Sequence, residues 1–286
     1  MDNHAKPETL VRVISENPRR ASSPSKSGVS FGTALENADG PAQPPSSLMC
    51  WTHPEWAQRF PWLAQGTTGR SPGHGEGDFR LFGPHGPAEE NANWMELARR
   101  HGFAGVLHAQ QVHGKDILVH REPGVGLSIG PDSDGHISDI PGAFMGVTVA
   151  DCVPVFLVDP RRRTVALLHA GWRGVAAGIL EGGISLLQDD FRADAEDLLL
   201  HLGPAICGSC YEVGPEVHAA LGHPEPDGPA PVDLRAALAA RAVEAGLLRS
   251  HITRSSFCTL CNGSPFFSHR AGEPKRQVGF LGIRPS

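Results

Sequence analysis

The hydrophobic and polar positions divide the chain into a polar N-terminal stretch and a longer region of regular apolar patterns. Residues 1–47 contain six prolines, many serines and a single aromatic residue, Phe31. A segment of this composition buries too little apolar surface to offset the entropy lost on ordering. We therefore predict a disordered tail over 1–47 and one folded catalytic domain over 48–286.

Helices and loops are predicted from the spacing of apolar residues. Apolar residues three and four positions apart indicate amphipathic helices over 89–101, 174–191 and 233–246. The last of these has Asp233 in the N-cap position and Gly246 just beyond its end. The stretch 66–88 is dense in glycine and proline and predicts a loop.

Short runs of branched and aromatic residues predict strands. They lie at 105–107, 116–120, 143–150, 153–159, 164–170, 197–203 and 277–283. The fourth and fifth runs, VPVFLVD and TVALLHA, flank a short polar turn and predict a β-hairpin. Strands and helices intermix without a strict alternation, which predicts a layered α/β or α+β fold with a mixed sheet.

Composition and charge narrow the class of protein. The chain has 286 residues, a net charge of −6 and an isoelectric point of about 6.2, which does not favour a nucleic-acid partner. No apolar run reaches the length of a membrane span, and the N-terminus lacks the apolar region of a secretory signal. We expect a cytoplasmic protein, away from membranes, whose six cysteines stay reduced.

The predicted hairpin brings two reactive side chains together. Cys152 precedes its first strand and His169 ends its second, so both lie far from the turn and nearly opposite each other. Such a pair suits two metal ligands, a nucleophile with its base, or a buried thiol beside a histidine. Asp151 is placed to orient a ligand. Arg173, at the start of the next predicted helix, suits a phosphate or carboxylate.

Several blocks of the sequence resemble one bacterial family, the YfiH-like proteins, also called laccase-domain or polyphenol oxidase proteins. The blocks, in chain order over about residues 60–284, are Gln111–Gly114, Ala150–Val155, His169–Gly174, Leu202–Ile206, Cys210–Gly214, Cys258–Thr259 and Phe266–Ser268. Blocks in a conserved order are more specific than any one motif.

The resemblance implies both a fold and an activity. It implies a layered mixed-sheet fold shared with a toxin-type deamidase domain. It also implies a zinc-dependent phosphorylase of purine nucleosides (adenosine, inosine, guanosine and methylthioadenosine) that deaminates adenosine, with nucleoside and phosphate as partners. The family's zinc ligands fall on His113, Cys152 and His169. A second description of some members, as peptidoglycan editing factors, implies a hydrolase that uses the Cys/His site.

The chemistry of the residues favours the zinc enzyme. Three protein ligands leave one tetrahedral position open, as in catalytic zinc sites. We expect Asp151 beside this metal and Arg173 on phosphate or substrate as catalytic residues. Copper is less favoured, because the 15 histidines include no His-X-His motif around Cys152. A third interpretation is a regulatory protein with a structural zinc. The chain is expected to be a monomer or a homodimer.

Three arginines are predicted to bind substrate. Arg70 lies in a loop that differs from the family's Ser-Thr-Arg-x-Gly-Gly pattern, with other residues around it. Arg270 and Arg276 match arginines of the C-terminal block, in which the family's tyrosine is replaced by His269. The Asp-Ala-Asp element before the second block is only partly matched by 132–136. These departures affect nucleoside preference more than the metal.

Two CxxC pairs raise the question of a second metal. They are Cys207/Cys210 and Cys258/Cys261, separated by 47 residues. This gap exceeds the 15–20 residues of a zinc ribbon. We therefore interpret the four cysteines as small buried thiols and keep a Cys₄ zinc as the alternative.

Overall fold

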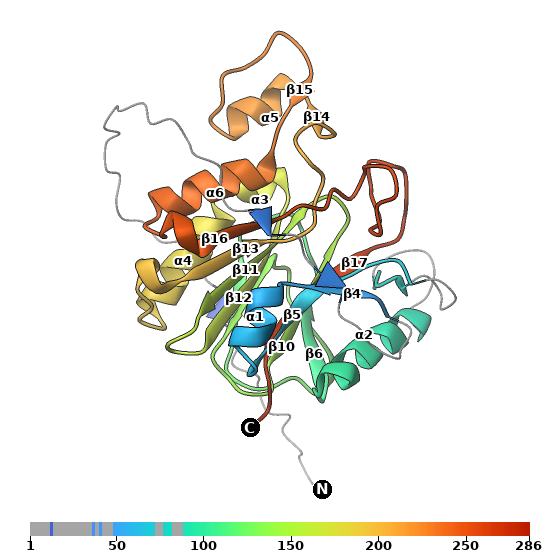
Figure 1. The fold of residues 1–286 in the computed structure, drawn as a ribbon, viewed down its shortest axis with the longest axis vertical. Helices are drawn as coiled ribbons and strands as arrows, with labels where there is room; N and C mark the ends of the chain where they lie inside the picture. The colour runs from blue at the N-terminus through green and yellow to red at the C-terminus, as the bar shows by residue number, and fades with distance from the viewer. Residues whose placement is uncertain (1–11, 14–35, 38–39, 42–47, 72–76, 82–87) are drawn as a thin grey trace, which may run out of the picture.

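Two β-sheets packed face to face, with helices on both outer faces, form the body of the protein (Figure 1). The structure is a computed structural model that describes residues 12–13, 36–37, 40–41, 48–71, 77–81 and 88–286. Both sheets contain parallel and antiparallel neighbours, as the mixed-sheet prediction requires.

Among the residues that the structure describes, the first sheet has eight strands. Their order is β1 (Arg12–Val13), β7 (Ile117–His120), β9 (Gly135–Ser138), β12 (Thr164–Ala170), β11 (Val153–Asp159), β13 (Leu199–Leu202), β16 (Ile252–Ser255) and β2 (Glu36–Asn37). Strands β11 and β12 form the predicted hairpin, and Val153 is paired with Ala170 at its open end.

The second sheet has seven strands within the described part of the chain. Their order is β3 (Gly40–Pro41), β4 (Cys50–Thr52), β5 (Leu63–Thr68), β17 (Gln277–Ile283), β10 (Phe144–Val149), β6 (Gly105–Ala109) and β8 (Gly126–Gly130). A small separate hairpin joins β14 (Glu212–Val213) to β15 (Ala230–Pro231).

The helices are α1 (Pro54–Arg59), α2 (Ala88–His101), α3 (Trp172–Ala177), α4 (Ile179–Asp189), α5 (Pro215–Ala220) and α6 (Leu234–Glu244). Helices α3, α4 and α6 cover the outer face of the first sheet, and α2 covers the second (Figure 1). Among the described residues, no helix has the length and apolar character that crossing a bilayer requires.

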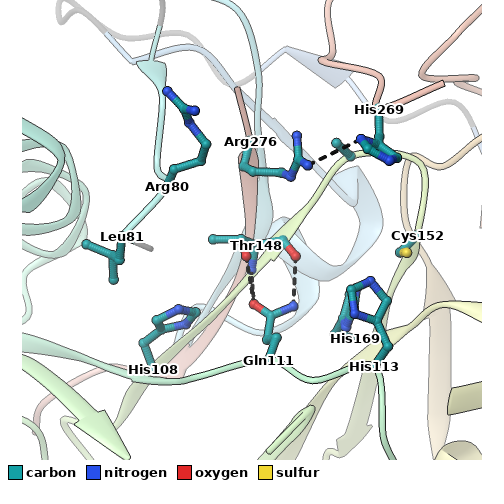
Figure 2. Close-up of a pocket in the computed structure, with 11 residues that line it drawn as sticks. Arg80, Leu81, His108, Gln111, His113, Thr148, Cys152, His169, His269 and Arg276 are labelled. Carbon is teal, nitrogen blue, oxygen red and sulfur yellow. Dashed lines mark hydrogen bonds between the residues drawn. The ribbon is translucent and has the colours of Figure 1, made fainter. Parts of the chain in front are cut away.

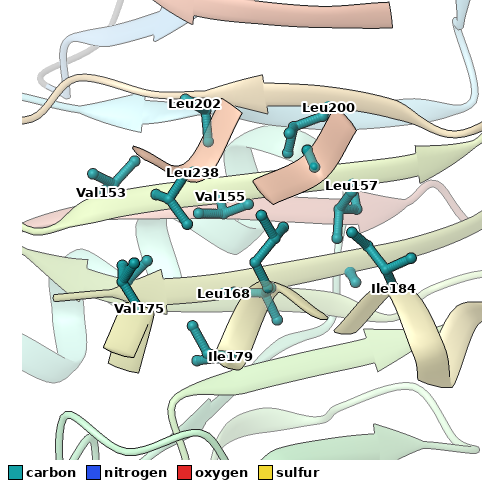
Figure 3. Close-up of a cluster of buried hydrophobic side chains, with 14 of the residues drawn as sticks. Val153, Val155, Leu157, Leu168, Val175, Ile179, Ile184, Leu200, Leu202 and Leu238 are labelled. Atoms are coloured by element: carbon teal, nitrogen blue, oxygen red, sulfur yellow. The ribbon is translucent and has the colours of Figure 1, made fainter. Parts of the chain in front are cut away.

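Three hydrophobic clusters hold these layers together. Phe156 and Leu167 of the first sheet pack against Met145 and Leu281 of the second. On the opposite face of the hairpin, alternate residues such as Leu168 pack under the helices, as Figure 3 shows. A third cluster, which contains Trp94 and Phe280, seats α2 on the second sheet. Both faces of β11 are therefore buried, which explains its continuous apolar sequence.

The structure corrects one of the predicted helices. The single helix expected over 174–191 is two helices, because Gly178 adopts a left-handed φ of 87° between them. Within the predicted disordered tail, 1–47, three residue pairs form two-residue strands at sheet edges. The rest of that tail lies outside the described residues. The Asp233 cap and the left-handed Gly246 are confirmed.

Three connections cross from the second sheet to the first. They follow β6, β8 and β10 and lead into β7, β9 and β11 respectively. The first crossing contains His113, the second Asp134 and the third Cys152. The packing of the two sheets therefore brings together residues from three separate parts of the chain.

Candidate metal centre and active site

His113, Cys152 and His169 converge on one point. One ligand atom from each residue lies within 4.8 Å of those of the other two. The rings of His113 and His169 stand edge to face, with centroids 4.8 Å apart. In the hairpin, Pro154 is paired with His169, so Cys152 is offset from His169 by two positions. The predicted closeness of Cys152 and His169 is confirmed.

Asp134 organises the two histidines. One carboxylate oxygen accepts hydrogen bonds from the His113 backbone N–H at 3.0 Å and from the His169 ring nitrogen Nδ1 at 2.7 Å. The other oxygen accepts from the N–H groups of Val112 and Gly114. The hydrogen bond to Nδ1 leaves Nε2 of His169 as the nitrogen that faces a metal. The three backbone bonds hold the left-handed conformation of His113, whose φ is 61°.

Two glycines of the HAGWRG block permit this close approach. A Cβ atom on Gly171 would lie 3.0 Å from the Cys152 sulfur and 3.1 Å from the His113 ring. A Cβ atom on Gly174 would lie 2.9 Å from the carbonyl oxygen of Gly114. Both contacts are tighter than side chains normally tolerate. The absence of side chains at Gly171 and Gly174 therefore allows the start of α3 to lie against the loops that contain Cys152 and His113.

The site polarises Cys152 and His169 toward a thiolate and an imidazolium when no metal is bound. Burial opposes ionisation of Cys152, but the charge of His169 and hydrogen bonds from His113 and His169 outweigh it and lower the pKa to about 6. Burial likewise opposes protonation of His169, but Cys152 and Asp134 raise its pKa to about 9. A thiolate is the form of cysteine that binds metals.

The donor set fits a transition metal ion. Two imidazole nitrogens and one thiolate suit zinc or copper, and the Asp134–His169 pair is the usual support for a histidine ligand. Asp134 is fully buried and His169 is 3% exposed, so this hydrogen-bonded pair is already withdrawn from solvent. The geometry thus supports the metal site that the sequence predicts.

A pocket of about 370 Å³ opens beside these ligands. Figure 2 shows Arg80 and Arg276 across the pocket from His113 and His169. The pocket is lined by Arg80, Leu81, His108, Gln111, His113, Thr148, Ala150, Cys152, His169, His269 and Arg276. Its size is within the range of small-molecule sites.

Polar contacts fix the walls of the pocket. The Gln111 side chain accepts hydrogen bonds from the N–H and hydroxyl groups of Thr148 and donates to its carbonyl oxygen at 2.9 Å. Asp78 fixes two cationic residues, because it accepts from the N–H groups of Arg80 and Arg276 and pairs with the Arg80 guanidinium at 2.9 Å. Arg276 also donates to three nearby carbonyl groups and contacts His269 at 3.5 Å.

Of the arginines predicted to bind substrate or anion, only Arg276 lines this pocket. Arg70 pairs with Glu273 and stacks on the Phe267 ring. The guanidinium of Arg270 donates to the Glu212 carbonyl at 2.9 Å and packs over Tyr211. Arg173 is exposed and packs over the ring of its neighbour Trp172.

Asp151 does not contact the ligand histidines through any hydrogen bond that we observe among the described residues. Its carboxylate accepts from the Thr259 hydroxyl at 2.6 Å and from the Arg270 N–H at 2.7 Å. Its backbone is left-handed, with φ of 85°. Asp151 therefore fixes the loop that bears Cys152, and the carboxylate that orients a ligand is Asp134.

Sequence reasoning missed Asp134 and Arg80. Asp134 belongs to the partly matched Asp-Ala-Asp element, and its position before a strand was the available signal. Arg80 lies in the glycine-rich loop and carries no local signal.

Comparison with known proteins agrees with this architecture. A family model described as "Multi-copper polyphenol oxidoreductase laccase" matches residues 84–284. Purine nucleoside phosphorylase YlmD of Geobacillus stearothermophilus is 35% identical over 194 residues, which cover 61% of this chain and 71% of the relative. Purine nucleoside phosphorylase ORF3 of Streptomyces griseus is 33% identical over 217 residues, or 72% of this chain and 87% of the relative.

Further matches extend the comparison to a second activity name and to solved structures. A protein named adenosine deaminase RL5, from an unknown prokaryotic organism, is 35% identical over 150 residues, 48% of this chain and 56% of its own. The crystal structure of YlmD from Geobacillus stearothermophilus has a TM-score of 0.74 at 29% identity and covers 86% of this chain and 99% of its own. With the predicted resemblance confirmed, the chain belongs to the laccase-like family of enzymes that includes the YlmD and YfiH proteins.

Proposed function

We propose that the protein is a zinc-dependent purine nucleoside phosphorylase, acting on adenosine, inosine, guanosine and methylthioadenosine, with adenosine deaminase activity. One observation carries the proposal: a single pocket joins the His113, Cys152 and His169 ligand set to the guanidinium groups of Arg80 and Arg276. The names of the relatives point to the same pair of activities.

The arginine side of the pocket suits phosphate. Burial and the positive charge of Arg80 lower the pKa of Arg276, whereas the charges of Cys152 and Asp78 act in the opposite direction. An anion between them would relieve this repulsion, and paired guanidinium groups match the geometry of phosphate oxygens. We therefore propose that Arg80 and Arg276 bind the phosphate. His269, in contact with Arg276, lies at the edge of the same region.

The reaction exchanges one bond at the ribose. A phosphate oxygen forms a bond to C1′ while the bond from C1′ to N9 of the purine breaks, and the base leaves with the electron pair and takes up a proton. Arg80 and Arg276 would hold and orient the phosphate for this attack. In deamination, the oxygen of water replaces the amino group at C6, and ammonia leaves. A metal held by His113, Cys152 and His169 would supply a Lewis acid beside either reacting centre.

A coupled assay with adenosine and inosine tests the proposal. We expect release of free base that requires phosphate and is abolished by a chelator. The Arg276→Ala substitution should raise the KM for phosphate about tenfold, equivalent to about 1.4 kcal/mol of binding. Arg173→Ala is the matched comparison and should have the smaller effect. Base release without phosphate, or equal effects of the two substitutions, would contradict the assignment.

Metal content gives a second test of the ligand set. Cys152→Ala should lose one equivalent of zinc per chain, as measured by atomic emission. Unchanged zinc content would remove Cys152 from the ligand set. Copper at this position would contradict the zinc assignment and favour the oxidase chemistry.

A peptidoglycan-editing hydrolase is the second candidate. The observation that favours it is the chain of contacts from Asp134 through His169 to Cys152, which resembles a nucleophile, base and orienting acid. Chelator-resistant hydrolysis of cell-wall peptides, without phosphorolysis, would support it. We also propose a cytoplasmic location, since all six cysteines are free thiols and a reducing compartment preserves them. We propose that the protein is a monomer or a homodimer.

A further inference from the structure

The two CxxC pairs form a second cluster, separate from the pocket. The sulfur atoms of Cys207, Cys210, Cys258 and Cys261 all lie within 4.8 Å of one another. The first pair follows β13 and the second follows β16, which is the parallel neighbour of β13 in the first sheet. A further bridge between Ala205 and Cys258 extends this pairing to the cluster. Parallel strands therefore bring together pairs that are far apart in sequence.

The distances between the sulfurs match one tetrahedral ion. The Cys261 sulfur lies 3.7 Å from that of Cys210 and 4.0 Å from that of Cys207. With zinc–sulfur bonds of about 2.3 Å, the edge of a ZnS₄ tetrahedron is about 3.8 Å. A disulfide bond is about 2.05 Å, so the observed distances are those of co-ligands rather than of a bonded pair. A four-iron cluster spreads its thiolates over separate iron atoms and would hold them farther apart.

Backbone groups are arranged to support a thiolate in the cluster. The N–H groups of Cys207 and Leu260 approach the Cys258 sulfur at 3.3 and 3.4 Å. Cys258 is buried, Cys207 and Cys210 are half-buried, and Cys261 is exposed. The sequence-based interpretation as buried thiols is therefore correct only for Cys258. Donated hydrogen bonds favour the charged form of a sulfur atom.

We propose that Cys207, Cys210, Cys258 and Cys261 bind one structural zinc ion. Four protein ligands complete the tetrahedron and leave no position for a substrate, which distinguishes this site from the three-ligand site in the pocket. The ion joins the loop after β13 to the loop after β16.

The zinc would also fix the loop that contains Cys152. Ile206, next to Cys207, donates its N–H to the carbonyl oxygen of Asp151 at 3.1 Å. Thr259, next to Cys258, donates its hydroxyl to the Asp151 carboxylate at 2.6 Å. Residues beside both CxxC pairs thus hold Asp151, the neighbour of Cys152. Loss of the structural zinc should therefore also weaken metal binding in the pocket.

Metal analysis of the full-length chain, purified under reducing conditions, tests the proposal. We expect one zinc equivalent that survives in Cys152→Ala and is lost in Cys261→Ser. Because Cys261 is exposed, its substitution spares the core. Cys50→Ala is the matched control and should keep this equivalent, since Cys50 lies outside the cluster and burial raises its pKa to about 11.

Cobalt substitution gives a readout that does not depend on activity or on the pocket. Cobalt(II) bound to the Cys152→Ala protein should show the strong thiolate charge-transfer and tetrahedral d–d bands of an S₄ site. These bands should disappear in the Cys152→Ala/Cys261→Ser protein and persist in Cys152→Ala/Cys50→Ala. Absence of the bands, iron in place of zinc, a zinc equivalent that survives in the Cys152→Ala/Cys261→Ser protein, or a disulfide within the cluster would each overturn the proposal.

Discussion

Substitution of Asp134 by asparagine tests how the candidate metal centre is built. The carboxylate accepts four hydrogen bonds, two on each oxygen, from three consecutive backbone N–H groups and from His169. Asparagine keeps the shape but replaces one oxygen by an NH₂ group. In either orientation of the amide, the two N–H groups that donated to the replaced oxygen then face the NH₂ group, which is itself a donor.

The size of the effect follows from this count. A hydrogen bond to a charged group contributes about 1.5–3 kcal/mol, so loss of two such bonds should cost about 3 kcal/mol or more. For a domain of this size that corresponds to a fall of about 6–12 °C in the midpoint of thermal unfolding. Metal affinity should fall about 10- to 100-fold, because His169 loses its orienting carboxylate or His113 loses its backbone support.

Thermal unfolding of the chelated protein and competition with a chromophoric chelator measure the two effects. Asp132→Asn is the matched control, because Asp132 is exposed and lies two positions away. Burial raises the pKa of Asp134, but His169 and the backbone N–H groups outweigh this and lower it. The stabilisation by Asp134 is therefore present above the ordinary pKa of aspartate and is lost as the pH falls through the lowered value. A stability loss under about 1 kcal/mol, with unchanged metal affinity, would refute the reasoning.

Four further predictions concern the candidate site and the helix α4. In metal-free protein, alkylation of Cys152 followed by peptide mass spectrometry should be half-maximal near pH 6, and His169→Ala should move this midpoint upward; a midpoint near 9 would contradict the thiolate pair. Gly171→Ala should weaken metal binding at least tenfold in chelator competition through its contact with Cys152. By contrast, a Cβ atom added at Gly182 within α4 would lie 3.9 Å from its nearest heavy atom, so Gly182→Ala should raise stability by about 0.5–1 kcal/mol. Thr259→Val should lower both the unfolding midpoint and the metal affinity of the pocket, because it removes the hydrogen bond to Asp151. If neither quantity changes, this hydrogen bond does not position the loop that contains Cys152.

Periodicity and turn chemistry predicted the elements whose signals are local, and they left β4, β5, β8, β9, β16 and α5 unpredicted. The β11–β12 hairpin and the Asp233 cap of α6 were readable from adjacent residues. The break at Gly178 was missed because an apolar helical pattern continues on both sides of it. The short helix α1 was also missed, since its six residues contain too few periods to show a pattern.

The residues of the candidate site also divide into those that local patterns predict and those that they do not. Cys152 and His169 lie at one end of a hairpin, so their closeness follows from antiparallel pairing. His113 was placed by resemblance to a family and not by spacing. Arg80 enters the pocket from a loop that is joined to the C-terminal segment by the hydrogen bond from the Arg276 N–H to Asp78, and no local pattern predicts such a contact.

The crossings between the two sheets explain why the candidate metal centre has this composition. Because β6, β8 and β10 run parallel, each of the connections that follow them leaves the second sheet at the same edge and enters the first. Backbone N–H groups at such crossings have no strand partners, and a buried polar group without a partner is costly. The Asp134 carboxylate on the second crossing satisfies three of these groups on the first and orients His169 with the same charge. The residue that makes the crossing structurally possible is therefore also the one that directs a ligand. For this reason, a substitution at Asp134 should reduce stability and metal affinity together.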